Sequence, residues 1–399
     1  MWETKVAINE VKEIRTKTTV YLGVGAIQKI DDIARDLKKR GYNKVVILTG
    51  KGAYKKTGAW DYVKKAFDDS QIKFLLYDKV TPNPIVDQVD EATKMARDFG
   101  AQVVIGIGGG SAIDAAKSTA VLLAYPEKTA RDLYGFTFTP EKAAPIIAIN
   151  LTHGTGTEAN RFAVITIPEK NYKPAIAYDC LYPLYSIDDP ALMTKLPANQ
   201  TRYVSVDAVN HIIEASTSKV ASPFSILLGK ETMRLVARYL PQSLAHPEDL
   251  TARYYLLYAS LIAGVSFDNG VLHFTHALEH PLSAVNPDIT HGLGLSVLLP
   301  AIVKQIYPAT AEVLSDVLSP IIEDLKGTPG EAEKAANGVR NWLYTLGITE
   351  RLSDLGFKES DVPKLVELTF NTPSLEFLLS LAPIPADRKV VEAIYRESL

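Results

Sequence analysis

Short apolar runs alternate with segments of helical periodicity through the first 150 residues, and this alternation limits the folds open to the chain. The apolar runs are Val20–Gly25, Lys44–Thr49, Ile72–Tyr77 and Gln102–Ile107. The segments between them, such as Ala26–Lys39, have the length and amphipathic pattern of helices. Strands that alternate with helices form parallel sheets covered by helices on both faces. We therefore expect an α/β fold that binds ligands at the carboxyl ends of its strands.

The second half of the chain has a different pattern. Between Arg161 and Tyr185 alternating residues indicate short strands, and Asp188-Asp189-Pro190 interrupts them. Helical periodicity continues beyond this point, in the segments Gln200–Ser216, Pro223–Tyr239, Leu250–Phe267 and Leu293–Tyr307 and in shorter ones after them. We therefore expect two domains, an α/β domain over residues 1–190 and an all-helical domain over residues 191–399.

Composition narrows the range of partners. The 399 residues carry a net charge of −3, which provides no basic footprint for nucleic acid. No stretch has the roughly 18 consecutive apolar residues of a membrane span, and the N-terminus lacks the basic start and apolar run of a signal peptide. Cys180 is the only cysteine, so no internal disulfide is possible. We expect a cytoplasmic protein that acts on a small molecule, with neither nucleic acid nor membrane as partner.

Histidine is concentrated in one window of the chain. Residues 270–292 contain four of the seven histidines, which are His273, His276, His280 and His291. His276 and His280 stand four residues apart, so on a helix both lie on one face. Pro281 is expected to end that helix. The following loop then lets His291 return toward the same point, and a metal site is the first hypothesis for such a cluster.

A second pair of candidate ligands lies earlier in the chain. Asp207 and His211 repeat the four-residue spacing, which alone indicates a surface ion pair more often than a ligand pair. Beside the histidine window they complete a possible ligand set of Asp207, His211, His276 and His291. One carboxylate and three imidazoles without a thiolate suit Fe(II), Zn, Ni or Mn. A catalytic metal must also accept the substrate oxygen as a fifth ligand, which favours Fe(II), although zinc can replace iron in purified protein.

Two glycine-containing loops follow apolar strands. Gly108, Gly109, Gly110 and Ser111 lie between a strand and a helix, where backbone amides and the helix N-terminus can hold a phosphate and Ser111 can cap the helix. A tight structural turn explains these residues equally well. The second loop, Leu151–Ala159, offers three threonines and two glycines to a polar ligand. His153 in this loop is expected to be solvated.

Four motifs occur in order along nearly the whole chain. They are Gly108-Gly-Gly-Ser-Ala-Ile-Asp-Ala-Ala-Lys117, Thr152-His-Gly-Thr-Gly-Thr-Glu158, Asp207-Ala-Val-Asn-His-Ile-Ile-Glu214, and His276-Ala-Leu-Glu-His-Pro-Leu-Ser-Ala284 through His291-Gly292. Together they resemble the successive signatures of the iron-dependent (group III) alcohol dehydrogenase family. The resemblance implies a Rossmann-like dinucleotide-binding domain, an all-helical metal-binding domain and a catalytic cleft between them, as in the dehydroquinate synthase-like superfamily.

The resemblance also implies roles for single residues. It makes Asp207, His211, His276 and His291 the metal ligands, and His280 the catalytic residue on the proton path. The Gly108–Ser111 loop resembles the family's pyrophosphate cradle. The other positions at which the family contacts the nucleotide are Asn83, Asp114, Thr152, Thr155 and Lys173. The implied reaction moves a hydride between a primary alcohol or diol, its oxygen bound to Fe(II), and the nicotinamide C4. Relatives are often dimers, so we expect a homodimer.

Two positions depart from the family's pattern. An acidic residue usually follows the second strand of members that prefer NAD, and it accepts hydrogen bonds from the adenosine ribose. Here Gly50 takes that place and Lys51 follows, so a 2′-phosphate meets no repulsion and NADP is expected over NAD. His273 stands where relatives usually have a small residue. It is either an additional polar group in the pocket or a side chain packed to one side.

Three alternatives remain open at this point. The first is a zinc-dependent enzyme of the glycerol or glycerol-1-phosphate dehydrogenase type, against which the additional histidine ligand argues. The second is a phosphate lyase and cyclase like dehydroquinate synthase, which steady accumulation of reduced cofactor with a simple alcohol would exclude. The third is a non-catalytic metal-binding protein, which would not bind nicotinamide.

Overall fold

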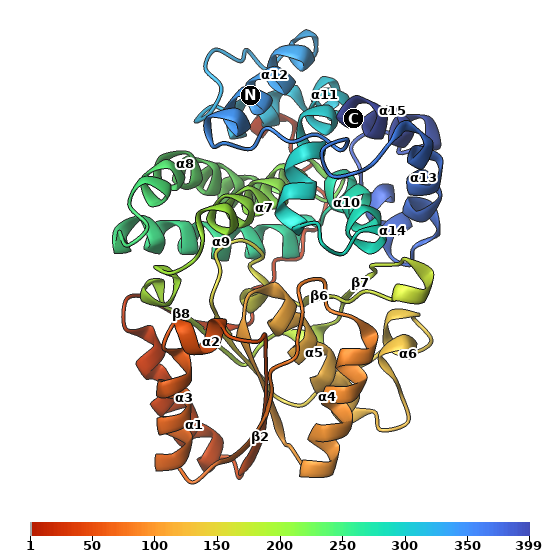
Figure 1. Ribbon diagram of the computed structural model, residues 1–399. Coiled ribbons are helices and arrows are strands. Elements are labelled where there is room, and N and C mark those ends of the chain that lie inside the picture. Colours follow the sequence, from red (N-terminus) through yellow and green to blue (C-terminus); the bar gives the residue numbers. More distant parts are fainter. Residues whose placement is uncertain (1) are drawn as a thin grey trace.

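A parallel β-sheet and a body of helices make up the two parts of the chain, as the computed structural model shows for residues 2–399 (Figure 1). Met1, which the sequence assigns to the N-terminal domain, lies outside the described residues. The sheet occupies the lower part of Figure 1, and the helices that follow it in sequence form the upper part. The α/β and all-helical fold class expected from the sequence is confirmed.

The main sheet has six parallel strands in the order β1-β8-β5-β4-β2-β3. Their bounds are β1 Thr19–Leu22, β2 Lys44–Thr49, β3 Lys73–Tyr77, β4 Val103–Gly108, β5 Ile146–Asn150 and β8 Tyr185–Asp188. The chain leaves β2 toward β3 on one side and returns to β4 on the other. The strand order therefore reverses between β2 and β4, and the loops after these two strands open a crevice of the kind that binds nucleotides.

Helices cover both faces of this sheet, because successive residues of a buried strand point to opposite sides. Val45 and Ile47 of β2 pack in one apolar core with η2 (Ala26–Gln28), α1 (Lys29–Lys39) and α3 (Ala59–Asp69). Val46 and Leu48 pack in a second core with α4 (Val86–Phe99), α5 (Gly110–Ala124) and α6 (Ala130–Tyr134). Each fully buried Val, Leu or Ile contributes about 1.5–3 kcal/mol, so this three-layer packing holds the strand ends in place.

Short elements connect the sheet to the helical part. After η3 (Thr157–Ala159), β6 (Phe162–Val164) and β7 (Ala175–Ala177) form the antiparallel hairpin that the alternation between Arg161 and Tyr185 indicated. The remaining short turns of 3-10 helix are η4 (Pro168–Lys170), η5 (Asp179–Leu181) and η6 (Pro190–Met193), and α2 (Ala53–Lys56) follows β2. In Figure 1 the β6–β7 hairpin lies between the sheet and the helical part.

The helical part is built around one continuous apolar core. Its helices are α7 (Ala198–Thr217), α8 (Pro223–Ala245), α9 (Leu250–Gly270), α10 (Phe274–Val285), α11 (His291–Val317), α12 (Ala332–Thr345), α13 (Val362–Asn371), α14 (Leu375–Ser380) and α15 (Arg388–Ser398), with η7 (Pro329–Glu331) and η8 (Glu359–Asp361) between the later ones. Helix α11 is long and apolar enough to cross a membrane, yet 78% of its apolar window is buried against the rest of the chain. This burial is that of a central core helix.

One helix end differs from the expectation. Pro281 does not end the helix of the histidine window, because α10 continues through it to Val285. A proline inside a helix removes one backbone hydrogen bond and costs about 3 kcal/mol. Every residue from Phe274 to Ala284 is buried, so tertiary packing on both sides of Pro281 outweighs this local cost.

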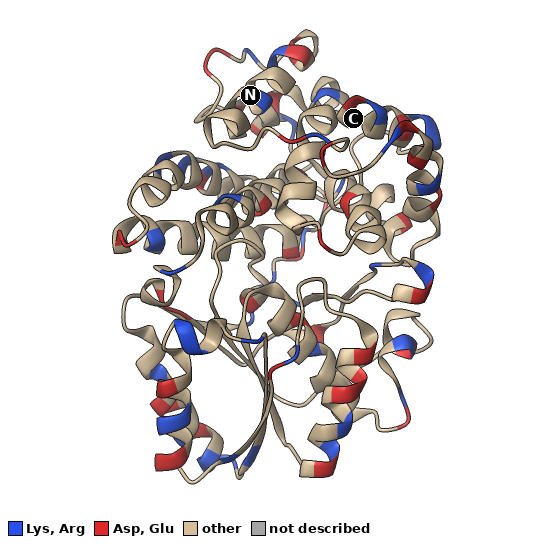
Figure 2. Cartoon of the chain, viewed as in Figure 1, with Lys and Arg blue, Asp and Glu red and all other residues tan. Residues whose placement is uncertain are grey.

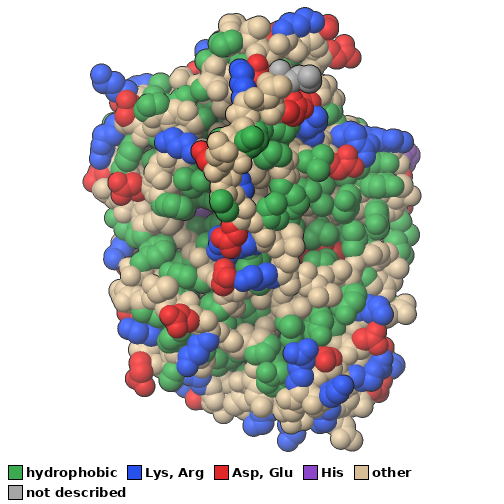
Figure 3. All heavy atoms as spheres, turned by 180° about the vertical axis from the view of Figure 1, so that it is seen from behind, with side chains coloured by type: hydrophobic (Ala, Val, Ile, Leu, Met, Phe, Trp, Pro, Cys, Tyr) green, Lys and Arg blue, Asp and Glu red, His purple; other side chains and the backbone are tan. Residues whose placement is uncertain are grey.

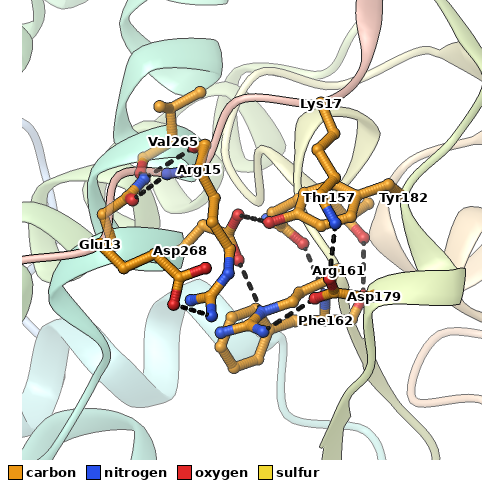
Figure 4. A network of polar contacts seen from close by, with 12 residues as sticks. Glu13, Arg15, Lys17, Thr157, Arg161, Phe162, Asp179, Tyr182, Val265 and Asp268 are labelled. Atoms are coloured by element: carbon orange, nitrogen blue, oxygen red, sulfur yellow. Dashed lines mark hydrogen bonds and ion pairs between the residues drawn. The ribbon is translucent and has the colours of Figure 1, made fainter.

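The chain crosses between its two parts twice. Residue Trp2, in η1 (Trp2–Lys5), donates its indole N–H to Asp316 of α11, so the N-terminal segment begins on the helical part and ends in β1 of the sheet. Figure 4 shows the polar network at this junction, in which the buried carboxylate of Asp268 in α9 contacts Arg161 and Tyr182 of the other part. The second crossing is the connection from β8 to α7.

Charged side chains lie mostly on the outer faces of the helices. Basic and acidic residues both occur along α1, α3 and α4 (Figure 2). From behind, charges of both signs again lie side by side with hydrophobic side chains between them (Figure 3). This mixture agrees with the small net charge of −3.

Candidate functional site

Helices α7, α10 and α11 bring the predicted metal ligands together in the interior. Oδ1 of Asp207 lies 3.4 Å from Nε2 of His211, 3.5 Å from Nε2 of His276 and 4.0 Å from Nε2 of His291. Asp207, His276 and His291 each offer one ligand atom, and these three atoms lie within 4.8 Å of one another. His211 does not belong to that set of three, but its ring stacks on His276 at 4.7 Å.

The donor atoms of this cluster fit a divalent metal ion. Oδ1 of Asp207 and Nε2 of His276 are buried without a hydrogen-bond partner. A buried polar atom that lacks a partner costs free energy, which coordination of a metal would offset. One carboxylate oxygen and several imidazole nitrogens are ligands that Fe(II) and Zn(II) accept.

Glu214 orients the second helix of the site. Its Oε1 accepts hydrogen bonds from the backbone N–H groups of His273 (3.0 Å), Thr275 (2.7 Å) and His276 (3.3 Å), which begin α10. Its Oε2 bonds to Nδ1 of His276, so Nε2 of that ring faces Asp207. Carboxylates that bind the outer nitrogen of a ligand histidine fix its tautomer and its direction.

Electrostatics of the site favour a cation. Burial alone would raise the pKa of Asp207, but His211 and the other nearby imidazoles hold it below its ordinary range. Burial would also lower the pKa of His276, but Glu214 and Asp207 raise it to about 9. In return the pKa of Glu214 falls to about 2, against the effect of burial. Asp207 and Glu214 therefore stay ionised at neutral pH, and a bound metal replaces the proton on His276.

His280 lies beside the cluster but outside the set of three around Asp207. Its ring centroid is 6.3 Å from that of His276 and 5.7 Å from that of His291. Nδ1 of His280 is buried and has no hydrogen-bond partner. Burial, reinforced by the positive charge of Lys173, lowers the pKa of His280 well below its ordinary value. The imidazole is therefore neutral at physiological pH.

The two loops predicted to bind a nucleotide pack against each other at the carboxyl ends of β4 and β5. A Cβ on Gly109 would lie 2.8 Å from the side chain of Thr152, and one on Gly110 would lie 2.8 Å from Thr155. Gly108 adopts a φ of 157° that side chains rarely allow, and its own Cβ would meet Ala112. Glycine is therefore required at these positions, because any side chain would collide with Thr152 or Thr155 of the second loop or with Ala112. These glycines lie at the N-terminus of α5.

Ser111 does not cap α5 as expected. The helix begins two residues earlier, at Gly110, with Gly109 as its N-cap and no side-chain hydrogen bond to the cap. The φ angle of Gly108 turns the chain early, so Ser111 already lies in the first turn. The backbone amides of this turn are still directed at the crevice, as a helix N-terminus requires for an anion.

Three predicted nucleotide contacts have partners within the protein. Both carboxylate oxygens of Asp114 accept hydrogen bonds, from the Thr157 hydroxyl at 2.7 Å and the Val164 backbone at 2.9 Å. The Asn83 side chain donates to the carbonyls of Pro287 and Ile289 in the loop before α11. The third, Lys173, contacts Glu279 and His291. Asn83 and Lys173 therefore join the α/β part to the segment that carries the metal cluster, whereas Asp114 is held within the α/β part.

Gly50 and Lys51 follow β2 at the edge of the crevice. Lys51 is exposed, and it makes no hydrogen bond or ion pair with any residue from 2 to 399. Lys55 and Lys56 of α2 follow closely, and both are exposed. Gly50 lies close to a backbone carbonyl, that of Val80, 3.3 Å from where its Cβ would stand. The end of β2 therefore presents basic side chains.

Both parts of the chain match models of one protein family. The sequence model of the iron-containing alcohol dehydrogenase family matches residues 17–190. The sequence model of the C-terminal part of the Fe-containing alcohol dehydrogenase family matches residues 201–399. The chain belongs to the iron-containing alcohol dehydrogenase family. The resemblance drawn from the four motifs is confirmed. The chain is an oxidoreductase acting on CH–OH groups, with iron and a nicotinamide cofactor.

Several relatives of this alcohol dehydrogenase cover almost the whole chain. It is 62% identical over 398 residues, all of both chains, to the long-chain primary alcohol dehydrogenase AdhA of Thermoanaerobacter ethanolicus. It is 32% identical to a 1,3-propanediol dehydrogenase of Klebsiella pneumoniae, covering 87% of this chain and 89% of that one. The crystal structure of the NADH-dependent butanol dehydrogenase A of Thermotoga maritima has a TM-score of 0.88 at 29% identity, covering 98% of both chains.

Two other histidines of this alcohol dehydrogenase are structural. His153 is buried, not solvated as expected, because its loop packs against α7 and α9. Arg253 donates to its Nε2 at 3.1 Å, so Nδ1 carries the proton and donates to the hydroxyl of Ser205. His273 is packed to one side, where its Nδ1 accepts from the N–H of Phe274 and its Nε2 bonds to Thr217.

Sequence reasoning missed two carboxylates that touch the metal cluster. Glu214 lies seven residues after Asp207, two turns further along the same face of α7, and this spacing is a signal that could have identified it. Glu279 precedes His280 directly and bonds to Nδ1 of His291. Glu279 stands next to His280 in the sequence, and its bond to His291 is visible only in the fold.

Proposed function

We propose that this enzyme interconverts primary alcohols or diols and their aldehydes at an iron held by Asp207, His211, His276 and His291. The convergence of the ligand atoms of Asp207, His276 and His291 within 4.8 Å carries this proposal. A bound Fe(II) supplies Lewis acidity at the substrate oxygen, and the nicotinamide ring accepts or donates the hydride. The names of the relatives support a primary alcohol as substrate.

The side chains of the site supply position and proton transfer. Glu214 directs His276 toward Asp207, and the surrounding buried residues exclude water. A proton must leave as the alcohol becomes a carbonyl, and Nδ1 of His280 is free to accept it. A neutral imidazole beside the reacting centre is the form that can take up a proton. We assign His280 as this proton relay.

We assign the nucleotide to the crevice between the loops that follow β2 and β4. Gly108, Gly109 and Gly110 with Ser111 hold the pyrophosphate, and Thr152 and Thr155 pack against these glycines from the neighbouring loop. Asn83 and Lys173 support the same region through contacts with the helical part, and Asp114 supports it through Thr157 and Val164 of the α/β part. At the end of β2, Gly50 leaves no carboxylate and Lys51 has no competing partner. These features support NADP over NAD.

We also infer a cytoplasmic homodimer made of two-domain subunits, with boundaries at residues 1–190 and 191–399. Ile8, Val11 and Ile14 of the N-terminal segment are exposed by 88%, 99% and 57%, which a second copy would cover. The single cysteine suits a reducing compartment. Sedimentation of the purified protein, alone and with Val11→Lys, tests the dimer, because the charged variant is expected to dissociate.

An anaerobic assay tests the proposed function. Chelator-stripped protein is mixed with NADPH and a short aldehyde after addition of Fe(II), Zn(II) or no metal, with NADH in parallel. We expect oxidation of NADPH that returns with Fe(II) and is lost in His276→Ala. Full activity without metal, or an unchanged rate in the variant, would contradict the site. Faster oxidation of NADH than of NADPH would contradict the cofactor preference alone.

A further inference from the structure

His291 presents its two ring nitrogens to different groups. It is the first residue of α11, and its Nε2 faces Oδ1 of Asp207 at 4.0 Å. Its Nδ1 bonds to Oε2 of Glu279 in α10. Since His291 is the most exposed of the four candidate ligands, with 26% of its side chain accessible, packing alone restrains it least. The hydrogen bond to Glu279 therefore decides where Nε2 points.

Glu279 is surrounded by groups that donate hydrogen bonds. The side chain is completely buried. Its Oε1 accepts from the Ser283 hydroxyl, and its Oε2 accepts from His291 and lies 3.4 Å from Nζ of Lys173. Three donors on two oxygens require an acceptor at both positions, which an ionised carboxylate provides and an amide does not.

The space for Glu279 depends on a glycine in the neighbouring helix. A Cβ on Gly294 of α11 would lie 2.9 Å from Cγ of Glu279 and 3.1 Å from its Oε1. Gly294 follows His291 by three residues, so the glycine lies one turn beyond the histidine that Glu279 orients. The absence of a side chain there lets the carboxylate reach Nδ1 of His291.

Lys173 brings a positive charge to this carboxylate from the other part of the chain. It stands between β6 and β7, and it is buried. Its Nζ lies 3.4 Å from Glu279 and 3.4 Å from Nδ1 of His291. Ligand atoms of Glu279, His280 and His291 also lie within 4.8 Å of one another, an arrangement that attracts a cation. The ammonium group of Lys173 supplies that cation.

We propose that Glu279 is a positioning residue that directs His291 to the metal, and that Lys173 holds Glu279 in place from the α/β part. This inference rests on the proposed metal site. Two consequences follow from it. Metal affinity depends on a residue that does not coordinate the metal, and it also depends on a contact between the two parts of the chain.

Co(II) titration of the metal-free enzyme, followed by visible absorption, tests the role of Glu279. We expect Glu279→Met to weaken Co(II) binding by about 10- to 100-fold and to alter the spectrum, because one imidazole no longer faces the metal. Glu279→Gln should fall between the parent and Glu279→Met. Its single oxygen can stay on His291 while its NH₂ faces Ser283, whose hydroxyl can turn to accept. Parent affinity and spectrum in both variants would overturn the proposal.

A remote substitution provides a test that leaves the carboxylate in place. Gly294→Ala pushes on Glu279 without contacting a metal ligand directly, so Co(II) affinity should fall at least fivefold. Gly330→Ala is the control, because no atom lies within 4 Å of the added Cβ. If the crystal structure of Gly294→Ala shows Glu279 displaced from His291 while the Co(II) affinity equals that of the parent, the proposal is overturned.

Lys173 is tested by a double-mutant cycle. Lys173→Met should weaken Co(II) binding less than Glu279→Met, and the double variant should bind no more weakly than Glu279→Met alone. Strictly additive losses would show that Lys173 acts independently and would overturn its part. His276→Ala separates this inference from the proposed function. If His276→Ala binds Co(II) like the parent, the metal site itself is wrong. If it loses Co(II) while Glu279→Met does not, only the positioning role fails.

Discussion

Replacing Glu214 should separate the stability of α10 from the direction of its ligand histidine. The carboxylate accepts three backbone N–H groups at the start of α10 through Oε1 and binds Nδ1 of His276 through Oε2. Alanine removes all four acceptor contacts and leaves buried donors unpaired. Glutamine can keep its oxygen on the backbone groups, which places its NH₂ against His276.

The expected magnitudes follow from this geometry. The contacts to His273 and Thr275 are well formed, and an unpaired buried donor costs about 1–3 kcal/mol. Glu214→Ala should therefore lower the free energy of unfolding by roughly 3–5 kcal/mol, near the upper end for one substitution. Glu214→Gln should cost only about 1–2 kcal/mol. Its NH₂ forces Nδ1 of His276 to accept, so Nε2 carries the proton and metal affinity should fall about 10- to 100-fold.

Urea unfolding of the metal-free protein and competition with a chromophoric chelator measure the two effects. Glu231→Gln is the matched control, because that carboxylate is partly exposed and pairs only with Arg234 on the surface. Its unfolding should change by less than about 0.5 kcal/mol, and its metal affinity should not change. An unfolding midpoint for Glu214→Ala equal to that of the parent would refute the capping role. Parent metal affinity in Glu214→Gln would refute the orienting role.

Four further outcomes follow from the site. Burial lowers the pKa of His153 to about 3, so the unfolded chain takes up a proton below about pH 6.5 that the folded chain excludes. Stability is lost as pH falls through this window, by about 2 kcal/mol between pH 7 and 5, and urea unfolding of His153→Gln should lack this loss. Lys51→Ala should raise the KM for NADPH about tenfold and leave that for NADH unchanged. Gly109→Ala should weaken binding of either nucleotide, measured by fluorescence, at parent metal affinity, because its Cβ displaces Thr152. His280→Ala should lower kcat by about 10²–10⁴ without loss of metal, and partial rescue by added imidazole would identify proton transfer.

Local pattern was sufficient for the elements whose burial repeats along the chain. Strand β2 spans Lys44–Thr49, as predicted, because a strand buried on both faces is apolar throughout. Helical spacing predicted that Asp207 lies beside His211 and that His276 shares a face with His280, and the expected return of the loop after Pro281 added His291 to the cluster. Pro281 misled the prediction because the local cost of a proline in a helix is visible in sequence, whereas the packing that outweighs it is not.

The missed residues depend on the angle between helices. The spacing from Asp207 places Glu214 on the ligand face of α7, but only the fold shows that α10 begins beside it. His153 was expected in solvent for the same reason, since its partners Arg253 and Ser205 lie far away in sequence. Glu279 bonds to a histidine twelve residues ahead, across a loop whose path the sequence does not specify.

The route of the N-terminal segment has a consequence for synthesis of the chain on the ribosome. Trp2 contacts Asp316, and β1 pairs with β8, so this segment emerges before its native partners have been synthesised. The 314 residues that separate Trp2 from Asp316 take roughly 15–60 s to translate. Throughout that time a segment that carries Ile8, Val11 and Ile14 is available to chaperones or to neighbouring nascent chains. This segment is therefore synthesised well before the partners that hold it in place.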